Sequence, residues 1–132
     1  MVETAAEITS LGQDAAEKAQ LIREFVDHAV TFTPDPLGLE LVKSPEYLLR
    51  EFFTRGEAFG DCDDVAVLAA ALGMAVGIPA RYTLLGFSLT DPFRHVLTEL
   101  FTPCQGWVEL DTTRPDQFPP GLKVVRWEHH GV

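Results

Sequence analysis

The sequence predicts an α+β domain in which one buried helix packs against an antiparallel sheet. Residues 65–76 contain no charged side chain, and their apolar residues would lie on every side of a helix, which is typical of a helix buried all round. After it, the stretches 80–87, 93–101, 106–111 and 122–127 indicate strands, because aromatic and β-branched residues recur in them. Helices followed by a run of strands are typical of this fold class.

Two further helices are predicted before the buried one. Residues 14–29 place apolar side chains at helical spacing, with charged residues largely on the other side, so they predict an amphipathic helix. The stretch 33–43 has two prolines near its start and predicts a surface loop. Residues 44–55 begin with a serine suited to an N-cap and a proline suited to the first helical position, and Gly56 ends this helix.

Length and composition limit the kind of protein. The chain has 132 residues, 46% of them hydrophobic, which suits a single domain over residues 1–132. Its formal net charge of −10 argues against nucleic acid or an anionic membrane as a partner, because Lys and Arg supply the affinity for phosphates. Residues 1–4 lack the basic start of a classical secretion signal, so we expect a cytoplasmic protein or one packaged into a particle.

The cysteine and histidine spacing predicts neither a disulfide framework nor a metal site. Two cysteines are too few for such a framework, and Cys104 falls in a predicted hairpin loop, where we expect no role for it. No close ligand pair of the Cys-x-x-Cys kind occurs, so we expect no metal. The residues of ligand type are Cys62, Cys104, His28, His95, Asp111, His129 and His130.

Cys62 is the first candidate for chemistry, because it lies at the predicted start of the buried helix. The N–H groups of a helix start stabilise an anion, so this position favours a thiolate. Asp61, Asp63 and Asp64 surround the cysteine; we expect them to cap the helix, with Asp61 and Asp64 spaced as in a capping box, and to point away from the sulfur. The alternative is that Cys62 is a small buried apolar residue, as most free cysteines are.

The two strands that follow supply the partners of a cysteine nucleophile. A hairpin centred near Pro103 places His95 opposite Asp111, and opposed side chains have Cβ atoms about 4.5–5.5 Å apart. A base that accepts the thiol proton and a carboxylate that orients the base are what such a nucleophile needs. The alternatives are a strand histidine bonded to the backbone and an aspartate that belongs to a turn.

Four segments resemble, in order and with similar spacing, the core of the transglutaminase-like superfamily. They are residues 60–64, 77–82, 95–99 and 106–113. The resemblance implies a papain-like fold and a catalytic triad formed by Cys62, His95 and Asp111. We expect no cofactor. Residues 34–40, together with Ser44-Pro45, also resemble the compact, stand-alone members encoded in bacteriophage and prophage genomes.

These observations predict cysteine-dependent acyl transfer through a thioester on Cys62, with a peptide or protein as substrate. We expect the thioester to react with water, which makes the enzyme a peptidase or amidase; reaction with a lysine amine would make it a crosslinking transglutaminase. The Cys62 backbone N–H is one expected oxyanion donor, and the candidates for the second are Tyr47, Trp107 and a backbone amide before Gly60. The competing interpretation is a non-catalytic structural or adaptor protein of a bacteriophage particle on the same fold.

Overall fold

The helices occupy the first part of the chain and the main sheet the last part, in a computed structural model that describes residues 1–32, 43–86, 95–110 and 126–131. The mixed helical and antiparallel-sheet architecture confirms the predicted fold class. The elements are α1 (Val2–Ile8), α2 (Ala15–Ala29), β1 (Val30–Phe32), α3 (Pro45–Arg55), β2 (Ala58–Gly60), α4 (Cys62–Ala75), β3 (Ala80–Gly86), β4 (His95–Thr102), β5 (Gly106–Glu109) and β6 (Arg126–Gly131).

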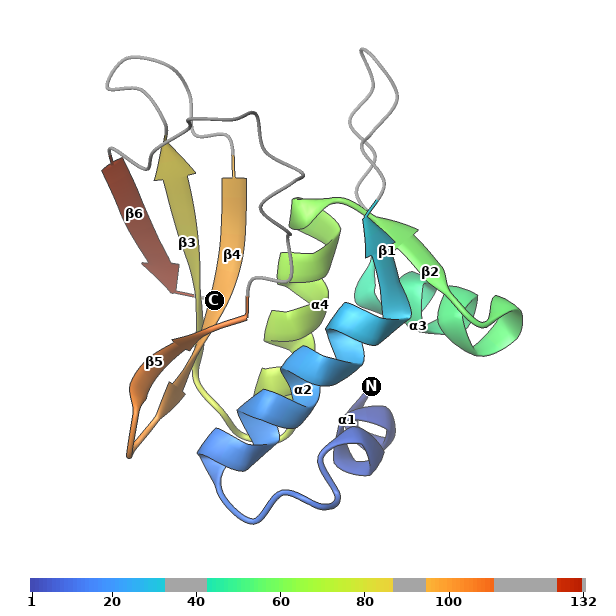
Figure 1. Cartoon of the computed structure of the whole chain (residues 1–132), viewed down its shortest axis with the longest axis horizontal. Coiled ribbons are helices and arrows are strands. Elements are labelled where there is room, and N and C mark those ends of the chain that lie inside the picture. Colours follow the sequence, from blue (N-terminus) through green and yellow to red (C-terminus); the bar gives the residue numbers. More distant parts are fainter. Residues whose placement is uncertain (33–42, 87–94, 111–125, 132) are drawn as a thin grey trace.

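Helix α4 is the predicted buried helix, and it lies in the middle of the molecule. Figure 1 shows it between the main sheet on one side and the other helices on the opposite side. Most of its residues are buried, as the uncharged stretch predicts, although Met74 in its last turn is 49% exposed. The α4 side chains pack with the apolar faces of α2 and α3 in the hydrophobic core, to which α1, β1, β2 and β4 also contribute.

The amphipathic helices agree with the sequence pattern at both ends. Helix α2 begins after Asp14, whose side chain accepts a hydrogen bond from Glu17 N–H at 2.9 Å. Helix α3 begins after Ser44, and Gly56 ends it in the left-handed conformation, with φ of 88°. That conformation strains residues with a Cβ atom, so the predicted glycine stop is confirmed.

The main sheet is antiparallel, with strand order β5-β4-β3-β6. The last strand was predicted over 122–127; residues 122–125 lie outside the described residues, and β6 spans Arg126–Gly131. A second, parallel ladder pairs β1 with β2, and no sequence pattern predicted it. Because β2 ends at Gly60, this small ladder directly precedes the start of α4.

The predicted centre of the β4–β5 hairpin is wrong. Thr102 pairs with Gly106, so the turn is centred on Cys104 instead of Pro103. Thr102 Oγ1 accepts a hydrogen bond from Gln105 N–H at 3.2 Å and donates one to the Gly106 carbonyl at 3.1 Å. Gly106 has φ of 72°, as a three-residue hairpin loop requires. The pairing that would place His95 opposite Asp111 therefore does not follow from this hairpin.

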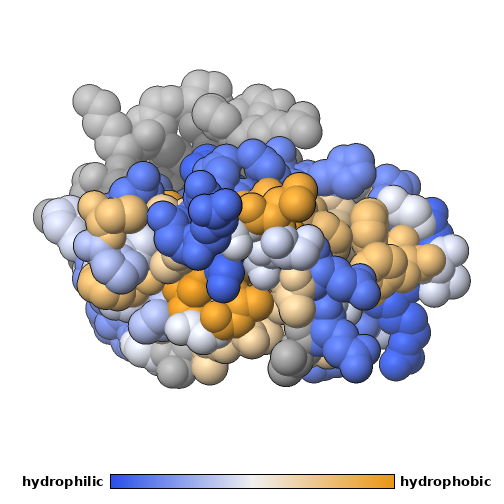
Figure 2. All heavy atoms as spheres, turned by 90° about the horizontal axis from the view of Figure 1, so that it is seen from below, coloured by the Kyte–Doolittle hydropathy of each residue, from blue (hydrophilic) through white to orange (hydrophobic). Residues whose placement is uncertain are grey.

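Hydrophilic and apolar residues alternate over the lower end of the molecule. Figure 2 looks at this end from below and shows hydrophobic areas separated by hydrophilic residues. Within the described ranges, no helix combines the length and apolar character of a membrane-crossing segment.

Candidate active site

Cys62 is the first residue of α4, and the start of this helix is closely capped. The Asp61 carboxylate accepts hydrogen bonds from the N–H groups of Asp63 at 3.1 Å and Asp64 at 3.4 Å. Asp64 in turn accepts one from Asp61 N–H at 3.1 Å, which confirms the predicted capping box. The half-buried Cys62 thiol therefore lies at the positive end of the helix dipole, where an anion is stabilised.

Asp63 differs from the expectation that all three aspartates point away from the sulfur. Cys62 Sγ lies 4.0 Å from Asp63 Oδ1, with the thiol as donor. The Asp61 and Asp64 carboxylates bind backbone N–H groups of the cap, whereas Asp63 follows the cysteine directly and its carboxylate lies beside the thiol. A carboxylate at this distance repels a thiolate, so it opposes the effect of the helix dipole.

Asp64 also connects the helix start to a distant part of the chain. Its side chain is 2% exposed, and Oδ1 accepts a hydrogen bond from Lys43 N–H at 2.7 Å. Gly60 allows this arrangement, because a Cβ atom there would come within 2.8 Å of the Asp64 Cβ. A buried carboxylate is stable only when its oxygens are bound, and here one N–H group binds each oxygen.

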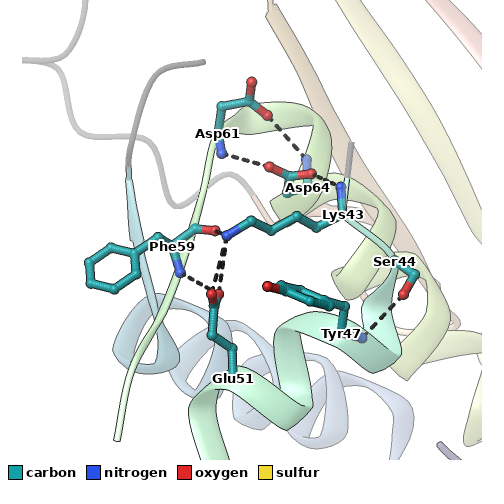
Figure 3. A network of polar contacts seen from close by, with 7 residues as sticks. All are labelled: Lys43, Ser44, Tyr47, Glu51, Phe59, Asp61 and Asp64. Atoms are coloured by element: carbon teal, nitrogen blue, oxygen red, sulfur yellow. Dashed lines mark hydrogen bonds and ion pairs between the residues drawn. The ribbon is translucent and has the colours of Figure 1, made fainter. Parts of the chain in front are cut away.

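Lys43 extends the connection to α3 and β2 (Figure 3). Its Nζ lies 3.2 Å from Glu51 Oε1 and 2.7 Å from the Phe59 carbonyl oxygen, while Phe59 N–H donates to Glu51 Oε1 at 3.1 Å. Burial raises the pKa of Glu51, but the hydrogen bond from Phe59 and the nearby Lys43 ammonium outweigh burial and hold that pKa below its ordinary value. The segment that leads into Cys62 is therefore held from both sides.

Sequence reasoning did not find Lys43 or Glu51. Lys43 lies 21 residues from Asp64, and its side chain reaches Phe59 and Glu51 from a position just before α3. Helix periodicity and capping patterns report only neighbours within a few residues, so a single sequence carries no signal for this network.

The start of α4 and the start of β4 lie at the same end of the molecule. Thr98 Oγ1 donates a hydrogen bond to the Ala66 carbonyl at 2.5 Å, and Leu100 packs against Gly73. Residue numbers therefore rise in the same direction along both elements, as Figure 1 shows. Cys62 precedes Ala66 by one helical turn, so it lies on the face of α4 that is turned toward β4.

His95 is the first residue of β4 and is 4% exposed. Side chains alternate along a strand, so His95 shares a face with Leu97 and Glu99, whereas Thr98 and Leu100 face α4. His95 therefore lies at the end of the sheet where α4 begins, on the face turned away from that helix. Asp111 lies outside the described residues.

Tyr47 and Trp107, the two candidate side-chain donors for the oxyanion, lie far apart in the structure: the first on α3 and the second on β5. The Tyr47 ring is on α3, with its centroid 5.5 Å from Lys43 Nζ, in the network beside the helix start. Trp107 pairs with Phe101, which lies six positions along β4 from His95, or roughly 20 Å. The Trp107 ring centroid is 4.2 Å from Arg81 Cζ. The structure therefore does not bring the Trp107 indole to the Cys62 thiol.

Cys104 lies at the exposed tip of the β4–β5 hairpin, as predicted for a loop residue. Neither Cys62 nor Cys104 forms a disulfide. Among the described residues, no group of three or more His, Cys, Asp or Glu side chains is arranged to hold a metal ion.

Comparison with known proteins identifies the fold. The sequence profile described as the transglutaminase-like superfamily matches residues 2–112, most of the chain. Two similar structures are a candidate protease from Parabacteroides distasonis (17% identity over 85% of this chain, TM-score 0.70) and a candidate cysteine protease from Cytophaga hutchinsonii (25% over 96%, TM-score 0.67). This chain covers 23% and 41% of those two chains, respectively.

A third similar structure is calcium-bound LapG from Legionella pneumophila, with 21% identity, a TM-score of 0.53, and coverage of 98% of this chain and 87% of that one. No curated protein sequence matches this chain.

The buried carboxylate of Asp64 makes a first test possible. Asp64→Asn puts an amide NH₂ where one of the two backbone N–H groups now donates, so we expect the free energy of unfolding to fall by about 1–3 kcal/mol in urea titrations. The matched control is Asp14→Asn, because Asp14 is an exposed N-cap of α2 and asparagine caps equally well. Equal, small losses in both variants would contradict the structural role of Asp64.

The Glu51 network predicts a pH dependence. Because the pKa of Glu51 is lower in the folded than in the unfolded chain, its ionised form stabilises the fold at neutral pH. That contribution declines as the pH falls below the ordinary value of 4.5 and is lost below the folded-state pKa. We expect Glu51→Gln to lower the unfolding free energy by about 1.5–3 kcal/mol at pH 7, and by less at pH 4.

Urea titrations of wild type and variant at both pH values measure this difference, and Glu46→Gln, an exposed change on the same helix, is the control. A loss that stays the same at both pH values would refute the charge argument.

Proposed function

The chain belongs to the transglutaminase-like superfamily, and on that premise we propose that it is a cysteine-dependent acyl-transfer enzyme that hydrolyses a peptide or amide bond. The observation that carries the proposal is the position of Cys62. It is the first residue of a capped, buried helix, at the end of the molecule where β4 begins with His95. Similarity to the two candidate proteases supports the same class of reaction.

In the proposed reaction, Cys62 attacks the substrate carbonyl carbon and His95 takes the thiol proton. Both residues lie at the same end of the molecule, where α4 and β4 begin. The tetrahedral oxyanion then collapses to a thioester, and His95 gives the proton to the leaving amine. Water next attacks the thioester, gives its proton to His95 and releases the acid, and the thiol is restored. We propose that Asp111 orients the imidazole.

The backbone N–H of Cys62 is the proposed first donor to the oxyanion, because helix-start N–H groups point at this position. Tyr47 remains a candidate for the second, since it lies on α3 in the network that holds the helix start. The Asp64 and Lys43 contacts would act by fixing the position of the nucleophile, without touching the substrate.

The reactivity of the two thiols tests the enzyme proposal. We expect iodoacetamide to alkylate Cys62 roughly tenfold faster than Cys104 near neutral pH, because an unassisted thiol is only a few per cent thiolate there. Mass spectrometry of both sites across a pH series measures the rates. His95→Gln should remove the advantage of Cys62, and His95→Ala repeats the test with a smaller side chain.

Circular dichroism of each variant shows whether it is folded. Two thiols that titrate alike in folded wild-type protein would refute the enzyme and favour the structural or adaptor role in a phage particle.

The acceptor of the acyl group is tested separately. We propose water, because a domain of this size offers little surface with which to shield a thioester. Glutamine-containing peptides are incubated with the protein, with and without a primary amine, and mass spectrometry follows the acid and amide products. The acid product should predominate in both incubations, and the Cys62→Ser variant should form neither the acid nor the amide product. An amide product that outruns the acid would establish crosslinking in place of hydrolysis.

A further inference from the structure

The face of the sheet away from α4 carries a groove. It has a volume of about 420 Å³ and crosses all four strands, with aliphatic side chains from β3 and β4, carboxylates from β4 and β5, and aromatic and imidazole side chains from β6. None of these side chains belongs to the capping network of Cys62. The groove is therefore distinct from the network that positions the nucleophile.

The groove combines an apolar floor with an excess of negative charge. Leu85 and Leu97 supply aliphatic surface, and Trp127 at the β6 side is 64% exposed. The charge of buried Glu99 is balanced, because Arg81 Nε lies 3.1 Å from its carboxylate. Glu109, exposed on β5, has no Lys, Arg or His within 4.0 Å among the described residues. A ligand that fits has an aliphatic part and a positive end.

Two residues that line the groove are neighbours of the proposed catalytic base, His95, in the sheet. Leu85 pairs directly with His95 across β3 and β4, and Leu97 lies two residues after His95 on the same face of β4. In the proposed mechanism the imidazole gives its proton to the leaving amine. A substrate segment lying in the groove would therefore carry the leaving group, and not the acyl group that bonds to Cys62.

We propose that this groove binds the leaving-group side of a peptide substrate and selects a lysine or arginine side chain there. The aliphatic stem lies over Leu85 and Leu97, and the charged end reaches Glu109. This assignment rests on the proposed function, because it takes His95 as the proton donor to the leaving amine. Charge complementarity favours the same choice, since Glu109 offers an unbalanced carboxylate next to apolar surface.

A binding experiment without turnover tests the proposal. Cys62→Ala protein is titrated into three fluorescently labelled pentapeptides that differ only at the central residue, which is lysine, norleucine or glutamate, and anisotropy gives each Kd. We expect the lysine peptide to bind roughly two- to fivefold more tightly than the norleucine peptide, because one partly solvent-screened ion pair adds about that much affinity. The glutamate peptide should bind most weakly. Adding Glu109→Gln should abolish the preference for lysine over norleucine.

Glu7→Gln is the matched control, because it removes the same charge from α1, on the other side of α4 from the sheet. It should leave the preference unchanged. Equal binding of lysine and norleucine, a lysine preference that survives Glu109→Gln, or no binding of any peptide would overturn the groove assignment. The thiol reactivity of wild-type protein judges the enzyme proposal independently, because Cys62→Ala cannot turn over in the binding test.

Discussion

The Asp64 carboxylate holds together the part of the molecule on which the proposed chemistry depends. It is almost fully buried and binds two backbone N–H groups, one from the N-cap of its own helix and one from Lys43. Removing a carboxylate from water is costly, so its two oxygens tolerate little displacement of either donor. The position of Cys62 is thus set by a buried polar contact as well as by the apolar packing of α4.

The elements that could be predicted from the sequence are those whose signals are local. Continuous apolar residues, amphipathic spacing and capping residues located α2, α3 and α4, and the capping box was read from the spacing of Asp61 and Asp64. The β1–β2 ladder was not predicted, because each strand has three residues and their pairing joins Val30 to Ala58 across a long intervening segment.

In the β4–β5 hairpin, the local conformation of the turn determines which residues pair, so residue spacing alone predicted the wrong pairs. Pro103 marked the turn correctly, but the hydrogen bonds of Thr102 and the conformation of Gly106 decided which residues pair. In the candidate site, the position of Cys62 followed from the helix start, whereas Lys43 and Glu51 depend on tertiary contacts that no short pattern encodes. The triad itself stays a prediction.

The β1–β2 ladder has a consequence for local stability. It consists of three residue pairs and is separate from the four-stranded sheet, and an isolated two-stranded ladder is marginally stable in water. Its second strand ends two residues before Cys62, so partial opening there would loosen the nucleophile while the main sheet stays folded. The Lys43 and Glu51 contacts to Phe59 act at this weak point and raise the free energy of such an opening.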